Sequence, residues 1–112
     1  MSIQLAFQDD KLRQLCESTV SAKRRFGVQT ARTLHTRLAD VQACANVAEL
    51  EGLGFASVDK GEDARILISI GDGYTVTAVV NNRPEPRLRG GRLDAKNVTR
   101  LKIMSIERAN EN

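Results

Sequence analysis

The fold is decided by residues 74–107, where two strand-like runs enclose a loop rich in proline, glycine and arginine. The first run is Tyr74–Val80 (YTVTAVV), and the second is residues 99–107 (TRLKIMSIE). Both alternate apolar and polar side chains, which is typical of strands buried on one face. Between them, residues 81–97 read NNRPEPRLRGGRLDAKN, and the two prolines exclude this segment from the centre of a sheet. The last strand is expected over residues 97–107, with a bulge or burial on both sides where its alternation is imperfect.

A hairpin partner precedes the first run. Residues 65–70 (RILISI) are strand-like, and Gly71-Asp72-Gly73 predicts a tight turn into Tyr74. A short, half-buried strand is also expected at residues 3–7 (IQLAF).

Two helices are predicted between residues 3–7 and the hairpin. Asp9 or Asp10 caps the first, because a short carboxylate accepts the free amide hydrogens there, and Gly27 ends it. Its apolar positions follow three- and four-residue steps: Leu12, Leu15, Cys16, Thr19, Ala22 and Phe26. The second helix has the same spacing at Ala31, Leu34, Leu38, Val41 and Ala45. Residues 47–53 are expected to form a short turn. The prediction is one α+β domain over residues 1–112, with a two-helix hairpin packed on a mostly antiparallel sheet.

Composition narrows the class of protein. The 112 residues are 41% hydrophobic and 28% charged, as in ordinary globular proteins. No apolar stretch is long enough for a membrane span, and the N-terminus lacks the pattern of a secretory signal, so a cytoplasmic location is expected. Cys16 and Cys44 are interpreted as small buried hydrophobic residues. Two cysteines and the single His35, which borders a helical stripe, are too few for a metal site.

Charge is unevenly distributed. Basic residues dominate segments 11–40 and 81–112, whereas acidic residues dominate 41–80. Arg87, Arg89 and Arg92 crowd the loop, a composition suited to phosphate contacts. Even spacing places Arg100, Lys102 and Arg108 on one strand face. That face is interpreted either as an RNA-binding surface, formed with Arg87 and Arg89, or as plain solvated charge.

The order of these elements resembles a known toxin family. The segments that carry the resemblance are IQLAFQDDKLRQLCES, the run KRRFG, AxxLHxRLxxVQAxxNVAEL and PEPRLRGGRLDAKNVTRLKIMSI. Together they resemble toxins of the RelE/HigB superfamily, the plasmid maintenance killer proteins of type II toxin–antitoxin systems. The resemblance implies a RelE/ParE-like fold.

The resemblance also implies an activity and a set of partners. These would be ribosome-dependent, metal-free and cofactor-free cleavage of mRNA, translation inhibition, and neutralisation by a cognate antitoxin with a helix-turn-helix pattern. The candidate catalytic residues are Lys60, Arg65, Tyr74 and Arg108.

Two positions depart from the family pattern. Thr75 stands where an arginine is common, and Asn110 replaces the terminal histidine. Two alternatives therefore stay open: a catalytically silent relative that binds an antitoxin or nucleic acid without cleaving RNA, and a gyrase-poisoning toxin of the same fold.

Overall fold

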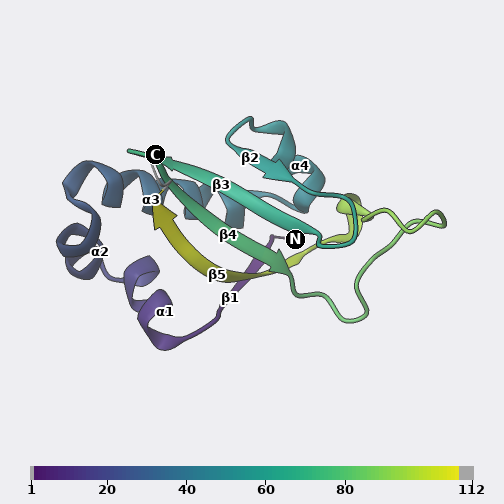
Figure 1. Ribbon diagram of the computed structural model, residues 1–112, viewed down its shortest axis with the longest axis horizontal. Coiled ribbons are helices and arrows are strands. Elements are labelled where there is room, and N and C mark those ends of the chain that lie inside the picture. Colours follow the sequence, from purple (N-terminus) through teal and green to yellow (C-terminus); the bar gives the residue numbers. More distant parts are fainter. Residues whose placement is uncertain (1, 109–112) are drawn as a thin grey trace.

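The computed structural model describes residues 2–108 and has the predicted α+β architecture (Figure 1). Asn110, the position of the missing family histidine, lies outside the described residues. The elements in chain order are β1 (Gln4–Phe7), α1 (Asp10–Glu17), α2 (Thr19–Phe26), α3 (Val28–Ala43), α4 (Val47–Gly52), β2 (Ala56–Val58), β3 (Arg65–Gly71), β4 (Tyr74–Val80), a short 3-10 turn (Ala95–Asn97) and β5 (Arg100–Arg108).

The strands form one open sheet in the order β1-β5-β4-β3-β2. All neighbours are antiparallel except β1 and β5, which run parallel, with Gln4 beside Arg100. The two edge strands are the shortest, at four and three residues. The β3–β4 hairpin is confirmed, and its turn uses positive φ at Gly71, Asp72 and Gly73. Strand β2 was not predicted, because its three residues are too few to show an alternating pattern.

The helices pack on one face of the sheet: α3 passes behind the strands in the view of Figure 1 and contacts β3, α1 contacts β1 and β5, and α4 contacts β2. Every second residue of β3 and β4 is buried toward them, as in the run Ile66, Ile68 and Ile70. The stripe of α3 meets this layer through Ala31, Leu34, Leu38 and Val41, all at most 5% exposed. This confirms the helical periodicity. Ala45, the last predicted member of the stripe, lies beyond the end of α3.

The first predicted helix is two helices. Asp9 caps α1 by accepting a hydrogen bond from the Leu12 amide at 2.9 Å, as expected. Ser18 then ends α1 in an extended conformation, and its hydroxyl caps α2 by accepting from the Ser21 amide. The apolar spacing continues across this break, so periodicity alone could not reveal it. Gly27 ends α2 with a φ of +88°, a conformation that favours glycine.

The loop between β4 and β5 is held by its own polar side chains. The Asn82 side chain accepts hydrogen bonds from the Thr99 and Arg100 amides, both at 3.0 Å, and donates one to the Thr99 hydroxyl. An isolated antiparallel bridge joins Arg87 to Leu93. Regular pairing of β5 begins at Arg100 rather than at Asn97. Among the described residues, no helix combines the length and apolar character needed to cross a membrane.

Candidate functional site

The face of the sheet opposite the helices is the candidate site. The strand pairing shows which residues belong to this face, because residues paired across strands point to the same side of a sheet. We call this surface the open face. Its residues on the three long strands are Arg65, Leu67, Ser69, Thr75, Thr77, Val79, Arg100, Lys102, Ser105 and Glu107, and Ser57 extends it on β2. No helix among residues 2–108 covers it, and Leu67 at its centre is 41% exposed.

Three cations cluster at the end of the open face nearest the β4–β5 loop. Arg65 and Lys102 both pair with Val79, so they flank it in one row across the sheet. With strands about 4.8 Å apart, their Cα atoms are separated by roughly 10 Å, and Arg100 lies about 7 Å from Lys102 along β5. None of the three forms an ion pair within the described part of the chain. We call Arg65, Arg100 and Lys102 the cationic trio; uncompensated positive charge of this kind is suited to an anion.

Arg108 does not share this face, contrary to the prediction. Thr77 pairs with Ser105 but the next residue, Ala78, pairs with Ile103, so Met104 is the extra residue of a β-bulge. A bulge shifts the alternation by one position. Arg100 and Lys102 consequently lie on the open face, while Arg108 lies on the helix side. The bulge was one of two options left open by the sequence, and even spacing failed because that rule assumes a regular strand.

Tyr74 also lies on the helix side. Its ring meets Phe26 of α2 edge-on, with centroids 5.0 Å apart. The Arg108 guanidinium covers the same ring at 5.7 Å and lies 3.5 Å from the Asp72 carboxylate. Tyr74 and Arg108 are cross-strand partners at the turn end of the sheet, far from Lys102. The four candidate catalytic residues therefore do not meet around one point.

Lys60 is held in the loop between β2 and β3. Its ammonium group lies 2.9 Å from the Glu51 carboxylate of α4, with both side chains about one-third exposed. Its carbonyl accepts a hydrogen bond from the Leu93 amide at 2.9 Å. Lys60 thus links the β2–β3 loop to α4 and to the β4–β5 loop, and the Glu51 carboxylate compensates its positive charge.

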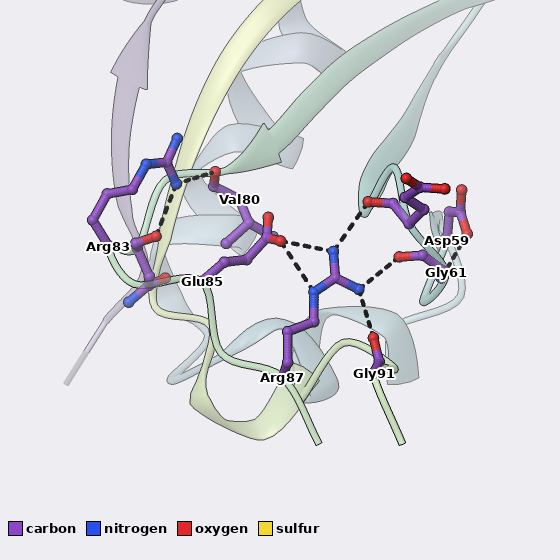
Figure 2. Close-up of polar contacts among 9 residues, drawn as sticks. Asp59, Gly61, Val80, Arg83, Glu85, Arg87 and Gly91 are labelled. Carbon is purple, nitrogen blue, oxygen red and sulfur yellow. Dashed lines mark hydrogen bonds and ion pairs between the residues drawn. The ribbon is translucent and has the colours of Figure 1, made fainter. Parts of the chain in front are cut away.

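Arg87 has a structural role in place of the predicted phosphate contact. Its guanidinium points toward Glu85, Gly61 and Gly91 in Figure 2. It donates to the Glu85 carboxylate at 2.7 and 3.1 Å and to the carbonyls of Gly61 at 2.7 Å, Glu62 at 3.0 Å and Gly91 at 3.0 Å. A guanidinium has five N–H donors, and these five bonds use them all. We call this arrangement the Arg87 clamp. It joins the β4–β5 loop to the β2–β3 loop.

Arg89 and Arg92 lie exposed at the tip of the same loop. Leu88 and Arg92 are joined there by a main-chain hydrogen bond of 2.8 Å. Neither arginine forms an ion pair among residues 2–108. Both extend the positive charge beyond the edge of the sheet, and Arg89 stays a candidate phosphate contact.

The remaining titratable candidates are structural. The His35 Nε2 atom lies 3.2 Å from the Leu15 carbonyl oxygen and so ties α3 to α1. Cys16 and Cys44 are free thiols; Cys44 is buried, as interpreted from the sequence, whereas Cys16 is partly exposed. Burial, reinforced by Glu17, raises the pKa of Cys16 to about 12, and burial also raises the pKa of Cys44. Such thiols are poor nucleophiles. Within residues 2–108, no three His, Cys, Asp or Glu side chains could hold a metal ion.

Two further features of the surface emerge from the structure: the first was missed from the sequence, and the second gives the basic excess of residues 11–40 a location. Hydroxyl groups of Thr75, Thr77 and Ser105 line the middle of the open face, and the alternate threonines of YTVTAVV were the available signal. On the helix side, Lys23 and Arg32 line a groove between α2 and α3. Both are exposed and form no ion pair in the described chain, so the molecule has a second, separate positive surface.

Comparisons with known proteins add no relative. No protein-family model matches this chain, and neither a curated protein nor a solved structure matches it. The likeness to RelE/HigB toxins therefore depends on the sequence segments quoted above and on a compatible α+β fold.

Proposed function

We propose that the protein is a translation-inhibiting toxin of a toxin–antitoxin pair that binds the phosphate backbone of RNA with the open face of its sheet. The observation that carries the proposal is the cationic trio of Arg65, Arg100 and Lys102. Three cations without a described carboxylate partner, on a face left uncovered by the described helices, favour a polyanionic ligand. The class of toxin comes from the sequence resemblance.

The arrangement supports binding more strongly than cleavage. Metal-free cleavage of RNA requires groups that activate the 2′-OH and stabilise charge on one phosphate, all within hydrogen-bond reach. Among the described residues, Lys60 is paired with Glu51, while Tyr74 and Arg108 lie on the other face from Arg65. We therefore favour a form of the proposal in which the protein blocks the bound RNA without cutting it. This form shares the absence of cleavage with the silent alternative but differs from it in inhibiting translation.

In vitro translation tests the proposal directly. Purified protein added to a bacterial extract should lower the synthesis of a reporter, because occupied RNA cannot be read. The variant Arg100→Ala/Lys102→Ala should restore synthesis, since it removes two of the three cations. Lys23→Ala/Arg32→Ala is the matched control, with the same loss of charge on the helix side. Undiminished reporter synthesis with the wild-type protein, or equal effects of the two variants, would refute the proposal.

Growth provides the second test and addresses the partner. Induced expression should slow growth, and co-expression of a cognate antitoxin should restore it. The reporter mRNA, recovered from the inhibited extract, should remain uncut. Discrete cleavage products would instead support the ribonuclease form of the toxin. Normal growth at high expression would reject toxicity and leave a stand-alone RNA-binding protein.

A further inference from the structure

The aromatic side chains are absent from the open face. The sequence contains three Phe, one Tyr and no Trp. Phe7 pairs with buried Ile103 on the helix side, Phe26 lies on α2, and Tyr74 packs against it. Phe55 contacts the core beneath α3. Each of the four rings also has an arginine guanidinium over it: Arg13 over Phe7 at 5.0 Å, Arg25 over Phe26 at 5.9 Å, Arg37 over Phe55 at 4.6 Å and Arg108 over Tyr74 at 5.7 Å.

This distribution argues against an unpaired strand as the ligand. Proteins that hold single-stranded nucleic acid combine a positive groove with aromatic rings on which the bases stack. The open face offers no ring. Asp59 and Asp63 line the hollow beside Arg65, and their negative charge acts on the phosphates of a single strand and of a duplex alike. An extended RNA strand could contact this face with its phosphates and 2′-hydroxyls, but its bases would gain no stacking here.

Beside the apolar Leu67 and Val79 and the acidic Glu107, the open face offers cationic and hydroxyl groups. The row that contains Arg65, Val79 and Lys102 lies next to a row that contains Thr77 and Ser105. No side-chain hydrogen bond within residues 2–108 uses the Thr77 or Ser105 hydroxyl. Phosphates and ribose 2′-hydroxyls are the groups that a double-stranded RNA displays across its wide minor groove. Hydroxyl side chains pair well with 2′-hydroxyls, because both groups donate and accept.

We propose that the ligand of the open face is double-stranded, A-form RNA, bound from its minor-groove side. The cationic trio contacts phosphates, and Thr77 and Ser105 contact 2′-hydroxyls. This inference rests on the proposed RNA-binding function and specifies its substrate class. Readout is by backbone and shape, so the sequence of the duplex has little effect on affinity.

The test is a fluorescence anisotropy titration with three probes of one sequence. These are an RNA duplex of about 16 base pairs, its separated single strand, and the corresponding DNA duplex. The RNA duplex should bind about tenfold or more tightly than the single strand, since the single strand lacks stacking partners on this face. Arg100→Ala/Lys102→Ala should flatten the salt dependence by about two units of slope, at ~0.9 per phosphate contact. The control Lys23→Ala/Arg32→Ala should leave both the affinity and the slope unchanged.

A second variant tests the hydroxyl contacts separately. Thr77→Val/Ser105→Ala keeps the shape and strand preference of these positions but removes both hydroxyls. This variant should bind the RNA duplex more weakly than the wild-type protein does, and its affinity for the DNA duplex should be unchanged. An unaltered preference for RNA over DNA would overturn the 2′-hydroxyl contacts.

The three probes also distinguish failure of the duplex inference from failure of the proposed RNA-binding function. Equal or tighter binding of the single strand, still sensitive to Arg100→Ala/Lys102→Ala, would overturn the duplex inference and leave RNA binding intact. No binding of any probe, or insensitivity to that double variant, would overturn the proposed function itself. Denaturant melts of each variant confirm that losses in binding do not come from unfolding.

Discussion

Removal of the Arg87 clamp should loosen the β4–β5 loop and lower stability moderately. Arg87→Ala deletes two hydrogen bonds to Glu85 and three to the carbonyls of Gly61, Glu62 and Gly91. The three carbonyls are at exposed positions, so water replaces most of what they lose. The charged pair is more protected, with Arg87 25% and Glu85 35% exposed. We therefore expect a loss of about 1–2 kcal/mol, well below the sum of five separate bonds.

Denaturant unfolding measures this loss, and the neighbouring Arg89→Ala is its control. Arg89 is exposed at the loop tip, so its removal should change stability by less than about 0.5 kcal/mol. Arg87→Lys should restore little of the lost stability, because a single ammonium group cannot reach all the acceptors that surround the planar guanidinium. Hydrogen exchange should accelerate at the Leu93 amide, which bonds to Lys60 across the two loops. Equal stability of the Arg87 and Arg89 variants, with unchanged exchange, would refute the clamp.

Three further predictions concern the rest of the fold. Leu38→Ala should cost roughly 2–5 kcal/mol in a denaturant melt, whereas Leu53→Ala, at a site 52% exposed, should cost far less; equal losses would reject the packing of α3. Asp9→Ala should lower the free energy of unfolding by about 1 kcal/mol through loss of the α1 cap, and Asp10→Ala should lower it by less. A larger loss for Asp10→Ala would show that Asp10, and not Asp9, caps α1. At pH 8, iodoacetamide should label Cys16 at least about a hundredfold more slowly in the native protein than in the unfolded chain, because its pKa of about 12 keeps the thiol protonated. Labelling at the unfolded rate would show that Cys16 is accessible and ionised.

Local patterns predicted much of the fold. The alternation of Tyr74–Val80 gave that strand its observed bounds, and the α3 stripe identified the buried side chains. Asp9 and Gly27 marked helix ends because capping depends on short-range chemistry. The break at Ser18 escaped prediction, since serine also occurs within helices and the apolar spacing runs through it.

The candidate site was harder to predict because its geometry depends on distant segments. The Met104 bulge is defined only by pairing with β4, and it moves Arg108 to the other face. Arg87 binds the carbonyls of Gly61 and Glu62, and main-chain acceptors have no sequence signature. Arg65, Arg100 and Lys102 were each candidates, but only the register showed that Arg65 and Lys102 flank Val79.

The parallel pairing of β1 with β5 has a consequence for the biosynthesis of the protein. β5 lies between β1 and β4, so the first strand has no partner in the sheet until residues 100–108 have been made. On the ribosome, the nascent chain must leave β1 and the β5-facing edge of β4 unpaired while translation proceeds at about 5–20 residues per second. The helices and the β3–β4 hairpin can form early from local contacts, but the complete open face is assembled only after β5 leaves the exit tunnel. A chain proposed to inhibit translation by binding RNA would therefore lack its complete binding surface until β5 has left the ribosome.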